Sequence, residues 1–482
     1  METMVLLNHV IMHITDYRTS DIYLFLVDII SKIMSEDNNI RVVVAIDFGT
    51  NFSGYAYAHK SLPEEIIFRN DWEKFGGRFK TPTVIEYKDD SYTTIKSWGY
   101  LALIEKPKKK KKSSSSESDG SSDTKRTFKP IELFKLHSLE SLKEKEKPFL
   151  PDGLDFKNIV KDFMKELGDD IKENLIRHWQ NLDFHNNVLI VLTVPAEFDD
   201  KTIEIFRECA FNAGFLKDNL RITTEPEAAA IYYLDSISKE EHELTPASFM
   251  VVDCGDNTVD LMTFELLEDE KLSALEEHVG DYCGSCCVDQ AFLKFVGEIV
   301  GTSAIESMKI NHHGQLQYFV QEFCRDVKIP FTGKKEDLDL QQPFVFDLEE
   351  ILPAIQQYVK EEERSKLEES EWLIEINFED IKGMFDPVIE KIIHLIRSQL
   401  DKSEKECPAI FLVGGFSESK YLQDRIREEF DEIVPNISVP LHPITSVVKG
   451  GKTVFYTDSE NKEVDQRTYL RQEGRDDFRD FQ

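Results

Sequence analysis

The stretch that decides the fold is VVVAIDFGTNFSGYAYAHK, from Val42 to Lys60. An apolar run leads to an acid, Asp47, and a turn of small residues then precedes an alternating segment that is typical of a second strand. Turns rich in Gly, Ser and Thr expose backbone N–H groups, which can hold phosphate oxygens. The segment therefore predicts a β-hairpin whose turn places one carboxylate beside a candidate phosphate cradle.

A second segment, FMVVDCGDNTVDLMTFEL from Phe249 to Leu266, repeats this pattern later in the chain. Here too an apolar run ends in an acid, Asp253, and a glycine-containing turn separates it from a second apolar run. Two such hairpins predict two similar lobes that face each other across a cleft, with functional groups at the carboxyl ends of the strands.

The acid in each turn has a chemical consequence. A carboxylate repels phosphate unless a hard cation lies between them, and Mg²⁺ is commonly shared between carboxylates and substrate phosphates. We therefore predict that Asp47 and Asp253 hold Mg²⁺ through water molecules. The alternative for each residue is an acid that only hydrogen-bonds within its own turn.

Composition limits the class of protein. The chain has 482 residues, which is more than one hydrophobic core usually serves, so two domains or lobes are expected. Its 58 basic and 91 acidic residues give a net charge of −33, which argues against binding to nucleic acid or anionic membranes. The seven cysteines are scattered and odd in number, which favours a reducing compartment. We expect a cytoplasmic monomer.

Three segments differ in composition from the rest of the chain. Residues 1–40 predict a helical N-terminal extension, because their apolar run contains acids and is too short to span a bilayer. The Lys/Ser-rich stretch 106–126 predicts a disordered insertion, and its run Lys108–Lys112 is either a solvated tether or a nuclear-localisation signal. Residues 456–482 predict a polar C-terminal tail.

The remaining sequence reads as alternating helices and buried strands. Strands are predicted at NVLIVLTVP (187–195) and AIFLVGG (409–415). Helices are predicted over Phe156–Gln180, Val288–Val300, Gln315–Lys328, Leu348–Ser370 and Phe378–Leu400.

Five motifs in register resemble the heat shock 70 kDa protein family. AIDFGTNFSGYA resembles the family's first phosphate segment, VVDCGDNTVDLMTF the second, and AIFLVGGFSESKYLQDRI the adenosine segment. VLTVPAEFDDKTIEIFRECAFNAGF with TTEPEAAAIYYL resembles the first connecting segment, and NFEDIKGMFDPVIEKIIHLIRSQL the helix before the adenosine segment. The turn DYCGSCCVDQAFLKF and the phrase VVKGG are most similar to the atypical branch called heat shock 70 kDa protein 12.

The resemblance implies a fold and a division of the chain. The fold would be the α/β actin-like ATPase fold, with two lobes of mixed five-stranded sheets and flanking helices around a nucleotide cleft. Lobe I is expected over residues 41–236, lobe II over 237–444, and a closing segment over 445–455 returns to lobe I. The peptide-binding domain of ordinary members is expected to be absent, because too few residues follow for a further domain.

The resemblance also implies two cofactors, ATP and Mg²⁺, and the residues that would hold them. Asp47 and Asp253 would hold the metal ion through water. Glu225, Thr258 and Asp260 would have the catalytic roles of orienting water and contacting the γ-phosphate. The nucleotide would be bound by Asp47, Gly49, Thr50, Asn51, Asp253, Gly255, Gly284, Ser285, Glu322, Arg325, Gly414 and Gly415.

Three positions depart from the family pattern. Asp256 stands in the second phosphate turn where the family has glycine. If it points inward, a carboxylate about 5 Å from a phosphate costs roughly 3 kcal/mol at an effective dielectric near 20; the alternatives are that it points to solvent or ligates the metal ion. Leu103 falls where ordinary members carry the catalytic lysine, with Lys106 as the nearest cation. Glu418 replaces the arginine that stacks on adenine. Hydrolysis is therefore less strongly indicated than binding.

The function favoured by these motifs is chaperone-like or scaffold activity controlled by Mg-ATP-dependent closure of the cleft. Protein clients or signalling partners would bind the closed and open states with different affinity. A nucleotide-free pseudo-ATPase that acts by protein interaction is one alternative. A small-molecule kinase of the same superfamily is another.

Overall fold

The structure is a computed structural model that describes residues 39–107, 129–139, 142–143, 147–238, 248–267, 272–275, 279–335, 343–403 and 405–450. Both predicted hairpins lie within these ranges. The N-terminal extension up to residue 38, most of the predicted insertion, the end of the closing segment and the C-terminal tail lie outside the described residues. Within the described ranges, every helix is too short or too polar to cross a bilayer.

The first hairpin lies at the centre of a mixed β-sheet. The strand order is β10 (Leu220–Thr224), β9 (Val188–Val194), β1 (Val42–Phe48), β2 (Phe52–His59) and β3 (Leu62–Phe68), with short β6 (Thr81–Pro82) paired to β2. β10, β9 and β1 run parallel, whereas β1, β2 and β3 are antiparallel neighbours. Every residue of β1 and β9 is buried, which explains why both segments are almost continuously apolar.

The second hairpin occupies the same place in a second mixed sheet. The strand order is β18 (Asn436–Ser438), β17 (Ala409–Val413), β11 (Ser248–Cys254), β12 (Val259–Leu266) and β13 (Leu272–Ala274), with β14 (Val279–Asp281) paired to β12. β18, β17 and β11 are parallel, and β11, β12 and β13 are antiparallel neighbours. The two sheets therefore share strand order and direction, and the predicted mixed α/β class is confirmed.

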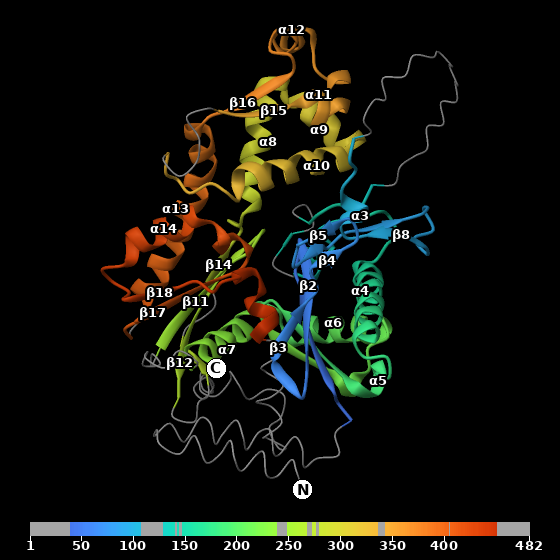
Figure 1. Cartoon of the computed structure of the whole chain (residues 1–482), viewed down its shortest axis with the longest axis vertical. Helices are drawn as coiled ribbons and strands as arrows, with labels where there is room; N and C mark the ends of the chain where they lie inside the picture. The colour runs from blue at the N-terminus through green and yellow to red at the C-terminus, as the bar shows by residue number, and fades with distance from the viewer. Residues whose placement is uncertain are drawn as a thin grey trace, which may run out of the picture.

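Helices cover both sheets (Figure 1). α4 (Phe156–His178) and α6 (Asp200–Asn212) bury apolar faces in one core with β1 and β9 of the first sheet. α8 (Cys286–Val300), α13 (Phe378–Lys402) and α14 (Lys420–Phe430) form a second core with β11, β12 and β17. Each sheet thus has its own hydrophobic core, which is the usual requirement for a layered α/β unit.

α7 (Glu225–Ser238) connects the two sheets. It follows β10 of the first sheet, yet Ala228 and Ala229 pack against Phe249 and Phe411 of the second sheet. In Figure 1 this helix lies below the centre of the molecule, between the blue strands of the first sheet and the yellow-green strands of the second. The helix N-terminus therefore lies where the two sheets approach each other.

A mostly helical region extends beyond α8 at the top of Figure 1. Its elements are α9 (Thr302–Asn311), α10 (His313–Phe323), β15 (Phe344–Asp347), α11 (Leu348–Ile351), α12 (Glu361–Glu369) and β16 (Leu373–Ile376). Shorter elements near the first sheet are β4 (Asp71–Trp72), β5 (Phe75–Gly76), β7 (Ile85–Tyr87), β8 (Ile95–Trp98), α3 (Tyr100–Leu103) and α5 (Phe184–Asn187).

Two of the predicted helices differ in the structure. The single helix predicted over Leu348–Ser370 is wrong, because α11 ends at Ile351 and a 3₁₀ turn at Pro353–Gln357 separates it from α12. Pro353 cannot donate a backbone hydrogen bond and its ring does not fit a helix interior. The helix predicted over Gln315–Lys328 is α10 followed by one π-helical turn, Cys324–Lys328. Such turns are frequent at functional sites.

Candidate functional site

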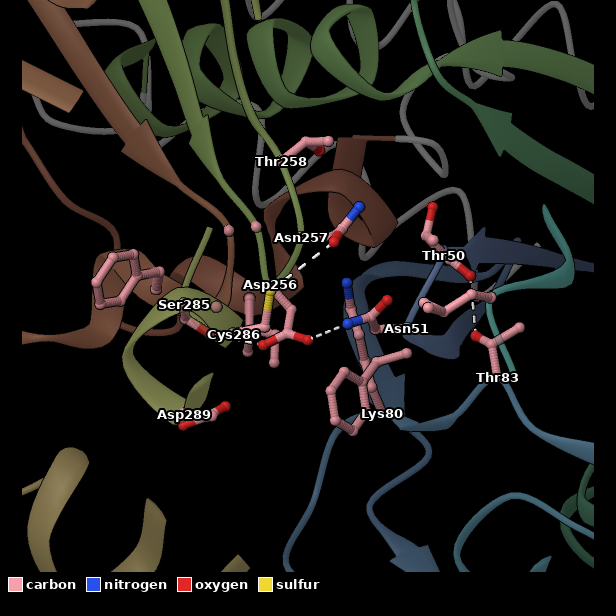
Figure 2. Close-up of a pocket in the computed structure, with 18 of the residues that line it drawn as sticks. Thr50, Asn51, Lys80, Thr83, Asp256, Asn257, Thr258, Ser285, Cys286 and Asp289 are labelled. Carbon is pink, nitrogen blue, oxygen red and sulfur yellow. Dashed lines mark hydrogen bonds between the residues drawn. The ribbon is translucent and has the colours of Figure 1, made fainter. Parts of the chain in front are cut away.

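A cavity of about 480 Å³ lies between the two sheets (Figure 2). Its wall is formed by the β1–β2 turn, the β11–β12 turn, the first residues of α7 and α8, and the turn after β17. These turns follow the carboxyl ends of β1, β11 and β17, and α7 begins directly after β10. Ligands of α/β proteins characteristically bind at such strand ends.

Most of the residues predicted from the sequence lie in this wall. They are Asp47, Gly49, Thr50, Asn51, Glu225, Asp253, Gly255, Thr258, Asp260, Ser285, Gly414 and Gly415. Gly284, Glu322 and Arg325 are not among the lining residues. The structure thus brings the two acid-led turns into one cavity, and the ligand that each residue binds stays a prediction.

Two glycines have a steric role in the wall. A Cβ at Gly414, where φ is +84°, would lie 2.3 Å from Asp253 Oδ1. A Cβ at Gly284 would lie 2.3 Å from the backbone oxygen of Asp256. Gly284 therefore supports the β11–β12 turn from behind, which explains why it does not line the cavity itself.

Lys80 neutralises the acid of the first turn. Its ammonium group lies 2.6 Å from the Asp47 carboxylate, and the two side chains are only 17% and 4% exposed. Burial alone would lower the pKa of Lys80, but the carboxylates of Asp47 and Asp253 outweigh that effect and raise it. Lys80 is therefore a fixed positive charge in the cavity wall.

Lys135 has the same role beside α7. Its ammonium group lies 3.3 Å from Glu225 Oε1 and also donates a hydrogen bond to the backbone oxygen of Phe48. The Lys135 side chain is 3% exposed, so it forms part of the packed wall. It links the end of β1 to the first residue of α7.

Burial acts on two further acids of the cavity, Asp253 and Glu225. Burial, together with the carboxylates of Glu225 and Asp260, raises the pKa of Asp253 to about 8. Burial likewise raises the pKa of Glu225, although Lys135 opposes the change. Crowded carboxylates of this kind are stabilised when a cation is placed among them.

The charge of the cluster fits a divalent cation. Asp47, Glu225, Asp253 and Asp260 supply four carboxylates, whereas Lys80 and Lys135 supply two ammonium groups in the same wall. Carboxylates thus outnumber ammonium groups among these six side chains, and hard cations such as Mg²⁺ prefer carboxylate oxygens and water. In the described ranges no group of three or more His, Cys, Asp or Glu side chains is arranged to hold a metal ion, so water-mediated binding stays the prediction.

Asp256 points into the gap between the two turns and has well-defined partners. Its carboxylate accepts hydrogen bonds from the side-chain amide of Asn51 and from Ser285 Oγ, the latter at 2.6 Å. Figure 2 shows Asn51 and Asp256 facing each other across the cavity. The sequence left open whether this acid points to solvent or into the cavity. The structure shows that it points inward.

Two side-chain atoms in the wall lack a hydrogen-bond partner among the described residues. They are Asn51 Oδ1 and Asn257 Nδ2, and both are buried. A buried donor left unsatisfied costs about 1–3 kcal/mol. A ligand with acceptor oxygens beside Asn257 would remove that cost, which a phosphate group would do.

The predicted adenosine-binding pair is arranged differently. Arg325 donates to both oxygens of Glu322 at 2.7 Å and also pairs with Asp326 at 2.6 Å. Neither Glu322 nor Arg325 lines the cavity, and the Arg325 side chain is 53% exposed.

Lys328 and its neighbours take the place of that pair in the wall. Its buried ammonium group donates to the Ser285 backbone oxygen at 2.8 Å and to Asp289 at 2.7 Å. Of the basic residues in this segment, Lys328 rather than Arg325 lines the cavity.

The cations of the cavity were also missed from the sequence. Leu103 lines the cavity without charge, and Lys106 lies over the rings of Phe75 and Tyr318, outside the wall. The ammonium groups beside Asp47 and Glu225 come from Lys80, just before β6, and from Lys135, on a 3₁₀ turn. Neither lysine lies in a motif, because each reaches the cavity only through packing between distant segments.

The fold and the cavity define a mixed α/β protein in which two like sheets meet at an acidic cavity. Comparison with curated proteins identifies particular relatives. Heat shock 70 kDa protein 12A of Mus musculus is 25% identical over 506 residues, which cover 86% of this chain and 70% of that protein. The Homo sapiens protein of the same name is 24% identical over the same shares. Heat shock 70 kDa protein 12B of Homo sapiens is 25% identical, covering 86% of this chain and 68% of that protein.

These relatives confirm the resemblance to the heat shock 70 kDa protein 12 branch. In addition, a family described as a domain of unknown function (DUF8340) matches residues 242–439. That range begins before β11 and ends after β18, so it spans the whole second sheet.

Proposed function

We propose that this chain binds Mg-ATP in the cavity, within an actin-like ATPase fold whose two lobes are built on the two sheets. One observation carries the proposal: two acid-led turns from corresponding strands of like sheets meet in the same cavity. The similarity to proteins named heat shock 70 kDa protein 12A and 12B supports it.

The residues that would hold the nucleotide follow from the wall. Backbone N–H groups of the β1–β2 and β11–β12 turns, together with the amide of Asn257, would donate to phosphate oxygens. Gly414 and Gly415 would allow the backbone to approach the sugar and base. Asp47 and Asp253 would hold Mg²⁺ through water, and the bound ion would neutralise phosphate charge.

Lys80 and Lys135 each hold one acid of the cavity in place through an ion pair. Lys135 holds Glu225 at the start of α7, where Glu225 would orient water together with Asp260. Lys80, paired with Asp47, would add a positive charge near the phosphates. Thr258 would contact the terminal phosphate. Because Asp256 occupies the gap between the turns, we expect any ATP hydrolysis to be weak.

The cellular role would be chaperone-like or scaffold activity. Binding of Mg-ATP between the sheets would draw the two lobes together. Protein clients or signalling partners would bind a surface whose shape changes with this closure. A monomeric state and a cytoplasmic location, with entry to the nucleus through Lys108–Lys112, stay predictions from the sequence. That run lies outside the described residues.

A second candidate is a nucleotide-free pseudo-ATPase that acts only by protein interaction. The hydrogen bond between Asn51 and Asp256 favours it, because this contact joins the two turns directly. The two candidates differ in one property, which is the affinity of the full chain for Mg-ATP.

A thermal-shift titration of the full chain with Mg-ATP, followed by product assays, separates the candidates. A ligand at one hundred times its Kd stabilises the folded state by about 2.7 kcal/mol, so tight binding gives a clear rise in Tm. Asp253→Asn should remove most of that rise, whereas Asp281→Asn, an exposed acid outside the wall, should keep it. Phosphate release without an acceptor would indicate an ATPase, and acceptor-dependent ADP release a kinase. No rise in Tm at millimolar Mg-ATP would favour the pseudo-ATPase.

A further inference from the structure

Asp256 joins three parts of the cavity wall that are distant in sequence. Its Oδ2 accepts from the amide of Asn51 in the β1–β2 turn, and its Oδ1 accepts from Ser285 Oγ before α8. The backbone fixes this arrangement from below, because Ser285 N–H donates to the Gly255 oxygen and Cys286 N–H to the Asp256 oxygen. The carboxylate is therefore held in place from two sides.

The partners of Asp256 are the kind of groups that bind phosphate. An amide N–H and a hydroxyl converge on one anionic group at the N-terminal end of α8, where the helix dipole favours negative charge. Asn257, the next residue, carries the buried amide nitrogen without a partner. Two donors of the kind that bind phosphate thus converge on the Asp256 carboxylate.

We propose that Asp256 is an internal competitor for the anionic group of the ligand, and that it ties the two turns together while the cavity is empty. This inference rests on the proposed function, since the group that competes with the Asp256 carboxylate is a nucleotide phosphate. A phosphate that binds to Asn51 and Ser285 must displace the Asp256 carboxylate, because both groups are negative and use the same donors. Asp256 therefore weakens nucleotide affinity. A ligand that arrives with a bound cation binds more tightly, because the cation offsets the repulsion between the Asp256 carboxylate and the phosphate.

Two lysines of the cavity wall make their hydrogen bonds with groups other than Asp256. Lys328 is occupied by Asp289 and by the backbone oxygen of Ser285, and Lys80 is paired with Asp47. Lys328 lies near enough for the Asp256 charge to raise its pKa, but its hydrogen bonds go to other groups, so it offsets only part of the repulsion between Asp256 and a phosphate. A divalent cation brought with the nucleotide would supply the missing charge.

The test is isothermal titration calorimetry of the full chain with Mg-ATP and, separately, with inorganic tripolyphosphate. The variants are Asp256→Gly, which removes the carboxylate, and Asp256→Asn, which keeps an acceptor oxygen for Asn51 but removes the charge. Asp281→Asn is the matched control, because it removes one exposed negative charge outside the cavity wall. Circular dichroism and urea unfolding establish that each variant is folded.

We expect Asp256→Gly to bind Mg-ATP at least tenfold more tightly than the natural chain, with Asp256→Asn between the two and Asp281→Asn unchanged. Affinities of Asp256→Gly and the natural chain within twofold of each other would overturn the inference while leaving the proposed function intact. An equal gain in Asp281→Asn would also overturn it, because the effect would then be one of net charge. No binding by any of the four proteins would contradict the proposed function itself, and the inference with it.

A second measurement needs no ligand. Hydrogen exchange of the empty protein should be faster in Asp256→Gly than in the natural chain at residues 49–53 and 284–287, because the tie between these segments is lost. Asp281→Asn should exchange at the natural rate there. Unchanged exchange in Asp256→Gly would contradict the proposed tie.

Discussion

The ammonium group of Lys80 lies 2.6 Å from the carboxylate of Asp47 inside the cavity wall. Asp47 is the penultimate residue of β1 and one of the residues from which a metal site is predicted, yet its charge is already matched by a lysine from another segment. The acid is thus part of a buried ion pair, and such a pair is costly to break from one side.

Replacing Lys80 by methionine should therefore destabilise the protein. Asp47 would remain as a buried carboxylate without its partner, and the expected loss is about 3 kcal/mol in the free energy of unfolding. The double variant Lys80→Met with Asp47→Asn should recover a large part of this loss. Lys74→Met is the control. The Lys74 ammonium group lies 3.9 Å from Glu73 and both side chains are 70% exposed, so this ion pair should contribute little to stability. Urea unfolding measures all three, and equal losses in Lys80→Met and Lys74→Met would show that the ion pair is unimportant.

The helical segment after α10 offers a matched pair of basic residues. Lys328→Met would leave Asp289 without its buried partner, and we expect it to cost about 3 kcal/mol of stability. Arg325→Gln removes a charge that is itself 53% exposed and keeps the exposed Asp326 beside it, although Glu322 is only 14% exposed, so its effect should be about 1 kcal/mol. Chemical denaturation of both variants gives the comparison. A larger loss in Arg325→Gln would mean that the exposed pair, not Lys328, holds this segment.

The glycine at the end of β17 makes a steric prediction. Gly414→Ala would place a methyl group 2.3 Å from Asp253 Oδ1 at a φ of +84°, so we expect a loss of more than about 2 kcal/mol. Gly383→Ala is the control, because a Cβ there meets nothing within 4 Å. Since Gly383 lies within α13, alanine should stabilise by about 0.5–1 kcal/mol. A tolerated Gly414→Ala would show that the turn can move away from Asp253.

Acid sensitivity is expected at Asp386 in α13. Burial alone would raise the pKa of this carboxyl group, but hydrogen bonds from Lys382 and Tyr421 outweigh it and hold the pKa below its ordinary value. A depressed pKa contributes stability above the unfolded value, and that contribution is lost as the pH falls through the folded value.

Urea unfolding of the natural chain and of Asp386→Asn tests this expectation. The stability difference between the two proteins should be constant above about pH 5 and should shrink below about pH 4. Asp401→Asn, an exposed residue at the end of the same helix, should show no such convergence. A difference between Asp386→Asn and the natural chain that does not change with pH would contradict the assignment.

The two hairpins were predictable from the sequence because their information is local. In β1–β2 and β11–β12 the apolar run, the acid and the small-residue turn lie within one short stretch, and the structure has both hairpins where the pattern indicates. Residues in these turns therefore line the cavity as expected. The single helix predicted over Leu348–Ser370 is wrong because Pro353 does not fit a helix interior, and the chain forms a 3₁₀ turn there.

The pairing of charges was not predictable in the same way. Lys80, Lys135 and the partners of Asp256 reach the cavity from segments far apart in sequence, and which residues meet there depends on how the two sheets pack. Glu322 and Arg325 show the converse case. The resemblance implied that both bind the nucleotide, but residues three apart on a helix can equally well pair with each other, and these two do.

The central claim is that a divalent ion bridges the acids of the two turns to a triphosphate. A crystal structure of the full chain with Mn²⁺ and a non-hydrolysable ATP analogue tests it most directly, because the anomalous signal of manganese locates the ion. The account predicts one ion between the phosphates and the carboxylates of Asp47 and Asp253, with Asp256 released from Asn51. An analogue bound elsewhere, or a cavity in which Asp256 keeps Asn51 and no ion is present at these acids, would contradict it.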